Sequence, residues 1–415
     1  MPAQPMAWWS PWVAVILTSV HGAPYVWQSH PIEVRNQSLY DSVTNKPWYG
    51  KGIGFPGLGD SPVKDYIAVL QRINKLSPTV NLIRLYQPPS CAIDSNCFEA
   101  FMQEADRLGI YVLVPGTGTS WGWLPNTVAG CHSPDGTPTA NDCYKAGGVL
   151  GWGQRMVQQF NYPNTLAICI GNEYDQMSPM WRYFGVLKAY ARDLKNYMQM
   201  CNTDAKSPTK GKMRMIPLAY ANSDDGGDYR VKPKAEYLFC GSSGISVDIF
   251  GLNIERWCDD VGGRGAYNGV NSWVRDDKFP GAFMFTEMGC SKYIGYTGAR
   301  DWAQVRGFFQ SFPAVTSYIA YTYNGNSNFD MFDGPTATAK IFEDGTNFFK
   351  QVNSTGVEPA PDGMPPSTPV CATELLGTPL DSVDSIQWYD TGATGWAPQC
   401  PRPYQAAEQK GVLVV

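Results

Sequence analysis

The sequence predicts a (β/α)8 barrel with a short C-terminal extension. Short β-branched or aromatic runs alternate with amphipathic segments of helical length, and eight such runs can be counted. Their span of about 250 residues matches the usual size of a barrel built from eight strand–helix units. An open, doubly wound sheet is the rival fold, but the chain lacks a glycine-rich phosphate-binding fingerprint after its first strand.

The elements follow in regular order along the chain. The expected strands are 50–55, 79–86, 109–115, 165–172, 213–220, 247–254, 281–287 and 316–323. The expected helices are 63–75, 97–108, 149–160, 183–200, 264–277 and 298–311. In such a barrel the C-terminal ends of all strands open on one face, which makes polar residues at these ends candidates for function.

The two ends of the chain differ in composition from its middle. Residues 1–22 contain no Asp, Glu, Lys or Arg, and the apolar stretch 12–20 is too short to span a bilayer but fits a signal peptide. The alternative is an apolar N-terminus without order, because the usual basic residues are missing. We expect a signal peptide at 1–22, a barrel domain at 23–356, and a proline-rich linker with a cysteine-containing tail packed on the barrel at 357–415.

Charge and histidine content exclude several classes of function. The 37 acidic and 32 basic residues give a net charge of −5 without blocks of one sign. Neither nucleic acid nor an anionic membrane surface is therefore expected as a partner, and no membrane span is expected. Three histidines leave too little for a histidine-based triad or a multi-histidine metal site. We expect acid/base chemistry from carboxylates, no cofactor, and a monomer.

Cysteine usage indicates the compartment. Eleven cysteines without a CxxC pair are unusual for a cytosolic chain. The N-x-S/T sequons at Asn36 and Asn353 are compatible with the secretory route. We therefore expect a secreted, disulfide-bonded glycoprotein.

Two of the expected strands end in a glutamate. In TLAICIGNEYD at 165–175, an unbroken apolar run leads into Asn172 and Glu173, and FTEMGC at 285–290 contains Glu287. Both strand ends would open on the same face of a barrel, so the two glutamates can converge on one cleft. A lone glutamate at a strand end is more often a solvated rim residue or an ion-pair partner. Two glutamates at these positions favour catalysis.

Cleavage of a glycosidic bond requires such a pair of carboxyl groups. One carboxylic acid protonates the departing oxygen, and the other attacks the anomeric carbon when the two groups lie ~5–5.5 Å apart. The product of this attack is a covalent glycosyl-enzyme, and the complete reaction retains the anomeric configuration. The sequence therefore indicates carbohydrate chemistry.

The chain resembles glycoside hydrolase family 72, the fungal-type β-1,3-glucanosyltransferases of the cell wall. The matching stretches occur in family order: GIYV at 109–112, GNE at 171–173, IPLAYANSDD at 216–225, KAEYLFCG at 234–241, DIFGLNIERWC at 248–258 and FTEMGC at 285–290. GNE alone is weakly specific, whereas the ordered set is strongly specific. The resemblance implies a retaining (β/α)8 enzyme with catalytic glutamates after strands four and seven.

The resemblance implies a role for each residue at these two strand ends. Glu173 would be the general acid/base and Glu287 the nucleophile. Asn172 would hold the sugar 2-hydroxyl, a contact that contributes to rate because it strengthens in the transition state. The alternative for Asn172 is a cap of the strand end.

Further substrate-binding residues are expected around this pair. Arg84 and Tyr86 fit positions that orient the nucleophile and line the donor subsites, although Arg84 is equally suited to a structural ion pair. Tyr323 fits a subsite tyrosine or a core tyrosine. In the loop GTGTSWGWLPN at 116–126, Trp121 and Trp123 are suited to stacking on a glucan or to packing within the loop.

The chain departs from the family pattern at three places. Phe55 and Pro56 stand where members carry Tyr-Gln-Pro after the first strand, and Pro115 replaces an aspartate at the end of the third. Glu255 replaces a tyrosine that contacts the nucleophile, and we count it among the substrate-binding residues. These changes affect the expected linkage specificity more than the expected class of reaction.

The change at Glu255 has an electrostatic consequence. A carboxylate close to Glu287 would raise a carboxyl pKa by like-charge repulsion unless Arg256 or Arg84 compensates.

The cysteines divide into paired and unpaired groups. The resemblance pairs Cys258 with Cys290, beside the nucleophile, and suggests that Cys240 bridges forward to Cys371 in the tail. Cys169, inside an apolar strand, is expected to be a buried free thiol, because nothing nearby would lower its pKa. The sequence assigns no partner to Cys201 and Cys400.

These observations lead to one expected function and two alternatives. We expect a retaining β-1,3-glucanosyltransferase, secreted to the extracellular space or cell wall, that cleaves a β-glucan chain and transfers it to another. The first alternative is a retaining endo-β-glucanase, in which water resolves the intermediate. The second is a non-catalytic glucan-binding wall protein on a degenerate barrel, suggested by the altered residues at 55–56, 115 and 255.

Overall fold

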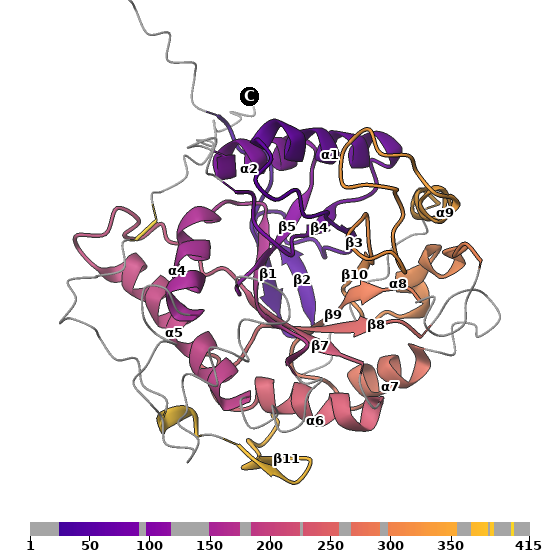
Figure 1. Cartoon of the computed structure of the whole chain (residues 1–415). Helices are drawn as coiled ribbons and strands as arrows, with labels where there is room; N and C mark the ends of the chain where they lie inside the picture. Colours follow the sequence, from indigo (N-terminus) through magenta and orange to yellow (C-terminus); the bar gives the residue numbers. More distant parts are fainter. Residues whose placement is uncertain are drawn as a thin grey trace, which may run out of the picture.

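A closed barrel of eight parallel strands forms the centre of the protein. The computed structural model describes residues 25–90, 97–117, 149–174, 184–224, 227–256, 267–290, 298–354, 367–380, 382–385 and 400–401. Within them, the strands are ordered β10-β3-β4-β5-β6-β7-β8-β9 around the barrel, so that apart from the closing pair neighbours in space are neighbours in sequence. The predicted (β/α)8 fold is confirmed (Figure 1).

The strands and helices alternate along the chain. The barrel strands are β3 (Gly50–Gly54), β4 (Leu82–Arg84), β5 (Tyr111–Pro115), β6 (Thr165–Asn172), β7 (Leu218–Ser223), β8 (Ile249–Ile254), β9 (Ala282–Met288) and β10 (Ser317–Ala320). The helices that surround them are α1 (Val63–Leu76), α2 (Cys97–Arg107), α4 (Val149–Gln159), α5 (Phe184–Thr203), α6 (Asp228–Phe239), α7 (Asn268–Asp276), α8 (Phe308–Ser311) and α9 (Glu343–Val352), together with the short 3-10 helix η5 (Ala303–Val305). Figure 1 shows the helices as a ring outside the barrel.

An N-terminal hairpin closes one end of the barrel. Strands β1 (Ile32–Arg35) and β2 (Ser38–Asp41) pair antiparallel, and the apolar residues Ile32 and Leu39 join the inward-facing cluster of the barrel strands. The Tyr111 hydroxyl, at the start of β5, donates to the His30 carbonyl over 2.7 Å. Because the hairpin occupies the end where the strands begin, the opposite end remains for a site.

Four expectations about the elements need correction. The fifth barrel strand begins at Leu218 and not near 213, because Pro217 has no N–H with which to join the ladder. Helix α6 was missed because it carries Pro233 in its interior, which normally breaks a helix. Helix α9, which follows the last barrel strand, was also missed. The expected helix at 298–311 is divided into η5 and α8, since Gly307 adopts φ 66° between them.

Two disulfides attach the C-terminal tail to the outside of the barrel. Cys240, at the end of α6, is bonded to Cys371, the pairing that the family resemblance implies. Cys201, in the last turn of α5, is bonded to Cys400. Between them the tail forms β11 (Glu374–Leu375), β12 (Thr378–Pro379) and the 3-10 helix η6 (Val383–Ser385). The tail therefore lies along the side of the barrel that α5 and α6 cover.

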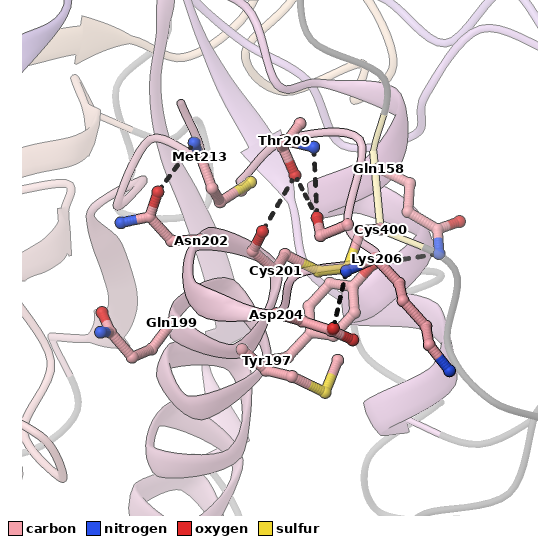
Figure 2. Close-up of a disulfide and its surroundings, with 12 residues drawn as sticks. Gln158, Tyr197, Gln199, Cys201, Asn202, Asp204, Lys206, Thr209, Met213 and Cys400 are labelled. Carbon is pink, nitrogen blue, oxygen red and sulfur yellow. Dashed lines mark hydrogen bonds between the residues drawn. A yellow bond between two sulfur atoms is a disulfide. The ribbon is translucent and has the colours of Figure 1, made fainter. Parts of the chain in front are cut away.

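Polar contacts order the chain around the Cys201–Cys400 bond. Figure 2 shows the Thr209 hydroxyl pointing to the Cys201 carbonyl over 3.4 Å, and the Asn202 side chain accepting the Met213 N–H over 3.2 Å. The Cys201 side chain is completely buried. Since α5 follows β6 and runs back along the barrel, its last turn lies at the end of the barrel opposite the C-terminal ends of the strands.

Loss of the Cys201–Cys400 bond should lower stability without changing the fold. The bond joins residues 199 positions apart, and a native disulfide of this kind contributes about 2–4 kcal/mol, chiefly by restricting the unfolded chain. We expect Cys201→Ala with Cys400→Ala to lower the melting temperature by several degrees in scanning calorimetry.

The two single variants provide the control. Either substitution alone removes the same disulfide, so each single variant should reproduce most of the fall in melting temperature seen in the double variant. A double variant that melts with the wild type, or single effects that simply add, would contradict the assignment.

Candidate active site

Four of the predicted site residues, together with Asn253, meet at the C-terminal end of the barrel. Arg84 ends β4, Asn172 ends β6, Asn253 lies near the end of β8, and Glu287 lies near the end of β9. Glu173 follows β6 directly. These five residues come from strands that are not all adjacent, and their side chains are linked by hydrogen bonds across the barrel mouth.

Strand irregularities aim two of these side chains into the barrel. Between β6 and β7 the register passes from Cys169↔Ala219 to Asn172↔Ala221, which inserts one extra residue in β6. Between β8 and β9 it passes from Leu252↔Phe285 to Asn253↔Glu287, which inserts one in β9. A bulge changes the face on which the next side chain lies. Asn172 and Glu287 therefore face the barrel mouth.

Glu287 is held by the guanidinium of Arg84. The Arg84 Nη1 atom lies 2.9 Å from Glu287 Oε1, and both side chains are almost completely buried, with 3% and 7% of their surfaces exposed. Nη1 also donates to the Thr286 carbonyl over 2.9 Å. An ion pair at this burial is sensitive to the loss of either partner, because the remaining charge would be left without compensation.

The same guanidinium reaches the other glutamate through two amides. Arg84 Nη2 donates to Asn172 Oδ1 over 2.5 Å, and Nη1 donates to Asn253 Oδ1 over 3.1 Å. Asn253 Nδ2 in turn donates to Glu173 Oε1 over 2.7 Å. Glu173 has φ 54°, which is uncommon for a residue other than glycine, and its N–H bonds to the Ala221 carbonyl over 2.8 Å. One connected network thus fixes both carboxyl groups.

Two tyrosines stand beside Glu287. The Arg84 guanidinium lies over the ring of Tyr86 at 4.7 Å, and the Tyr86 ring meets the edge of Tyr321 at 5.8 Å. The Tyr86 hydroxyl is buried and close enough to Glu287 to lower its pKa, but no hydrogen bond of good geometry joins the two. The Glu287 charge in turn raises the pKa of both tyrosines, after burial as the main cause.

A pocket opens next to this network. It lies at the C-terminal ends of β4, β5 and β6, and its lining residues are Arg84, Leu85, Tyr86, Pro115, Thr117, Cys169, Gly171 and Asn172. Cys169, a buried free thiol as expected, donates its S–H to the Gly171 carbonyl over 3.2 Å. Burial raises the pKa of this thiol, which leaves it protonated and unreactive.

The carboxyl groups of the site repel one another. Burial raises the pKa of Glu287 to about 8, the charges of Glu173 and Glu255 add to the rise, and Arg84 opposes it. Burial and the Glu173 charge raise the pKa of Glu255 to about 7. The repulsion expected from Glu255 is therefore present.

Arg256 does not compensate for this repulsion. Its guanidinium forms short hydrogen bonds to Asp224, and it lies 2.8 Å from Asp228 Oδ1. Among the two arginines considered, only Arg84 faces Glu287.

One predicted site residue lies elsewhere. Tyr323 is completely buried, its ring stacks on Phe332 at 3.9 Å, and its hydroxyl donates to the Thr336 carbonyl over 2.9 Å. It is a core tyrosine, and the prediction of a subsite role for it is wrong. Tyr321, two residues earlier, lies close enough to Glu287 for the charge of that carboxylate to raise the pKa of Tyr321, after burial as the main cause.

Sequence reasoning missed three members of the site: Asn253, Thr286 and Tyr321. Strand alternation alone does not identify Tyr321, because Tyr321 and Tyr323 both follow β10 with the parity of its inward residue Ile319. Asn253 lies in the quoted stretch DIFGLNIERWC, where its inward position on β8 was a usable signal. Trp121, Trp123 and Cys258 lie outside the described residues. Cys290 is disulfide-bonded.

Metal and membrane features were sought in the part of the chain that the structure describes. There, no group of three or more His, Cys, Asp or Glu side chains is arranged to hold a metal ion. Over the same residues, no helix combines the length and apolar character needed to cross a bilayer.

Two carboxyl groups at the C-terminal ends of the fourth and seventh barrel strands define a class of site. Barrel enzymes that cleave glycosidic bonds use such a pair, one group as the acid and the other as the base or nucleophile. The comparison with known sequences agrees with this class. Residues 23–354 match the glucanosyltransferase family, glycoside hydrolase family 72, and the chain belongs to that family.

Its relatives include several fungal enzymes. The chain is 28% identical to the 1,3-beta-glucanosyltransferase GAS4 of Saccharomyces cerevisiae over 284 residues, which are 64% of this chain and 53% of that protein. It is 26% identical to the 1,3-beta-glucanosyltransferase gas5 of Schizosaccharomyces pombe over 235 residues, which are 55% of this chain and 41% of the relative. The chain thus spans about half the length of these relatives.

Solved structures of the same fold are known. Saccharomyces cerevisiae Gas2p in complex with laminaripentaose superimposes with a TM-score of 0.62 at 20% identity, covering 84% of this chain and 75% of that one. Another structure, of ScGas2 in complex with a compound numbered 7, gives a TM-score of 0.65 at 19% identity, covering 88% of this chain and 78% of that one. At these identities the likeness concerns the fold.

Replacing Glu255 should stabilise the protein more at high pH than at low pH. The folded-state pKa of Glu255 is raised from 4.5 to about 7, so ionisation of this carboxyl destabilises the fold progressively between those values. Glu255→Gln stays neutral throughout. We expect it to gain about 2–4 °C in melting temperature at pH 8 relative to wild type, and little at pH 4.5.

The exposed Glu374 on β11 provides the matched control. Glu374→Gln should melt with the wild type at both pH values. Equal effects of Glu255→Gln at pH 4.5 and pH 8 would contradict the account.

Proposed function

We propose that the chain is a retaining β-1,3-glucanosyltransferase that uses Glu287 as nucleophile and Glu173 as general acid/base. The observation that carries this proposal is the network in which Arg84 binds Glu287 while Asn253 binds Glu173. Family membership supports the reaction class, and the Gas2p complexes with laminari-oligosaccharides support the type of substrate.

The first half of the reaction forms a covalent intermediate. The Glu287 carboxylate attacks the anomeric carbon of a bound β-glucan while the bond from that carbon to the glycosidic oxygen breaks. Glu173 gives its proton to the departing oxygen, so the leaving chain ends in a hydroxyl. Arg84 keeps Glu287 in place for this attack and neutralises its charge before the bond forms.

The second half transfers the glycosyl unit. Glu173, now a carboxylate, takes the proton from a hydroxyl of an incoming glucan, and that oxygen attacks the anomeric carbon as the bond to Glu287 breaks. Two displacements at one carbon retain its configuration. Transfer requires that the acceptor glucan outcompete water for the intermediate.

Asn172 would bind the sugar at the same time. Its Oδ1 already accepts from Arg84 and from Asn253, so its Nδ2 is the atom available to donate to the sugar 2-hydroxyl. This role would connect substrate binding to the residue that holds the nucleophile. Tyr86, the pocket on β4 to β6, and Trp121 with Trp123 would supply further substrate contacts.

Glu255 would tune the site in addition to contacting substrate. Its charge favours protonation of Glu287, and its own raised pKa keeps part of its population neutral near pH 7. A neutral carboxyl can donate a hydrogen bond to a sugar oxygen as well as accept one. We include Glu255 among the proposed substrate-binding residues for this reason.

The proposed setting is extracellular. A signal peptide at 1–22, secretion to the medium or cell wall, and a monomer acting without a cofactor belong to this proposal. The disulfides Cys201–Cys400 and Cys240–Cys371 fit an oxidising compartment.

Substitution of either glutamate should abolish turnover. We expect Glu287→Gln to lower kcat on laminari-oligosaccharides by more than about 10³-fold, because glutamine cannot form the glycosyl ester, and Glu173→Gln by about 10²–10⁴-fold. Mass analysis of products from oligosaccharides of defined length gives the measurement, with Glu374→Gln as the variant expected to behave as wild type.

The products also separate the alternatives. Wild-type products longer than the starting laminari-oligosaccharide indicate transfer, whereas only shorter products indicate an endo-β-glucanase. Cello-oligosaccharides assayed in parallel test the linkage. Normal turnover by both glutamate variants would sink each enzyme hypothesis, and glucan binding without any product would favour the degenerate-barrel protein.

A further inference from the structure

Asn253 lies at the centre of the polar network. It belongs to β8, only 3% of its surface is exposed, and it stands between the side chains of Glu173 and Arg84. The inward positions deeper in the barrel are apolar: Leu82, Leu113, Ala167, Ala219, Ile249, Ala282, Met284 and Ile319. A buried amide at this level requires partners for all of its polar atoms.

The amide makes every hydrogen bond that its atoms allow. Nδ2 donates to Glu173 Oε1 over 2.7 Å and to Asn172 Oδ1 over 3.0 Å. Oδ1 accepts from Arg84 Nη1 over 3.1 Å and from the Thr286 hydroxyl over 2.8 Å. An asparagine amide has two N–H donors and one oxygen with two lone pairs, so its capacity is full.

These partners determine which way the amide points. Rotated by half a turn, the NH2 group would face the guanidinium and the hydroxyl, while the oxygen would face two other oxygens. The contacts with Arg84, with the Glu173 carboxylate and with Asn172 Oδ1 would then be repulsive, since Arg84 can only donate and the two oxygens can only accept, whereas the Thr286 hydroxyl could adapt. Arg84 and the two acceptor oxygens therefore direct the N–H groups of Asn253 toward Glu173 and Asn172.

We propose that Asn253 is a positioning residue for the acid/base step, holding Glu173 by Oε1 so that the transferable proton is carried on Oε2. This inference rests on the proposed function, in which Glu173 protonates the leaving oxygen. Because Oδ1 of the same amide is bound to the guanidinium that holds Glu287, Asn253 also fixes the two carboxyl groups relative to each other.

A positioning role suits the backbone at Glu173. The residue lies beyond the last ladder pair of β6, where its φ of 54° turns the chain away from the strand. Its side chain is only half-buried, in contrast to the buried side chain of Glu287. The bond from Asn253 ties the acid/base carboxyl to the rigid barrel.

Asn253→Asp separates the contact with Arg84 from the contact with Glu173. An aspartate has nearly the same shape and can still accept from Arg84 and Thr286, but it cannot donate to Glu173 and it places a negative charge beside it. The other charged groups around residue 253 and Glu173 are Arg84 from β4, Asp224 after β7, Glu255 and Arg256 after β8, Glu287 from β9, and Arg300.

The expected result is a change in the pH profile together with a selective loss of rate. Activity falls as pH rises through deprotonation of the acid, and a carboxylate next to Glu173 favours its protonated form. The basic limb of kcat against pH on laminaripentaose should therefore move upward by about one unit in Asn253→Asp. At neutral pH kcat should fall about 10–100-fold, with less than about 3-fold change in KM.

A substrate that needs no acid provides the second readout. Dinitrophenolate departs from 2,4-dinitrophenyl β-laminaribioside without protonation, so kcat/KM on this substrate should fall less than about 5-fold in Asn253→Asp. A purely structural defect would lower both rates together. Asn271→Asp makes the same chemical change at a buried asparagine of α7, and its pH profile should match that of the wild type.

The kinetic results distinguish failure of the positioning role from failure of the proposed function. An unshifted basic limb with equal losses on both substrates would overturn the positioning role while leaving the proposed function intact. Absence of wild-type turnover on laminari-oligosaccharides would overturn the proposed function by itself.

A carbon-13 NMR titration tests the contact between Asn253 and Glu173 even without turnover. The Glu173 carboxyl signal is assigned by its loss in Glu173→Gln, and the midpoint of its titration should move upward in Asn253→Asp. If that variant does not fold, Asn253→Ala should show a smaller upward shift of the same midpoint.

Discussion

The site depends on one buried guanidinium. Arg84 carries a positive charge into the barrel, where 2% of its surface remains exposed, and it is bound there by Glu287, Asn172, Asn253 and the Thr286 carbonyl. Burial of such a charge is costly unless it is paired and its N–H groups are satisfied. These partners lie near the ends of β6, β8 and β9, so the need to satisfy Arg84 brings β4, β6, β8 and β9 into one geometry. That geometry places both candidate catalytic carboxyls.

The surroundings of this centre are more acidic than one arginine can neutralise. Glu173, Glu255 and Glu287 interact with one another, and burial acts in the same direction on the pKa of Glu287 and of Glu255. Arg256, which follows Glu255 directly, is held by Asp224 and Asp228 and leaves the repulsion in place. Glu255 thus affects the protonation of the site while the network around Arg84 remains intact.

The fold and the position of the two glutamates at strand ends could be predicted from the sequence, because periodic apolar runs and strand-end carboxylates are local signals. The features that depend on the exact register of the strands could not be predicted. Strict alternation along β9 would place Glu287 on the side of Phe283 and Phe285, and only the bulge turns it inward. Tyr323 was predicted for the site, whereas Tyr321 is the tyrosine near Glu287; alternation places both on the side of Ile319 and does not distinguish them. The Cys201–Cys400 bond joins segments 199 residues apart, so no local pattern could reveal it. Asn253 has no conspicuous local signal beyond its inward position, and its importance appears only from its four partners.

The central claim is that the carboxyl held by Arg84 is the one that reacts with sugar. Covalent trapping tests it most directly: incubation with an activated 2-deoxy-2-fluoro laminari-oligosaccharide, followed by digestion and mass spectrometry. A 2-fluoro sugar slows resolution of the intermediate, so the modified residue can be identified. The account predicts one label per chain, on the peptide containing Phe285, Thr286 and Glu287, with the sugar esterified to Glu287. A label on Glu173 or Glu255, or no label on a folded protein that binds the reagent, would contradict it.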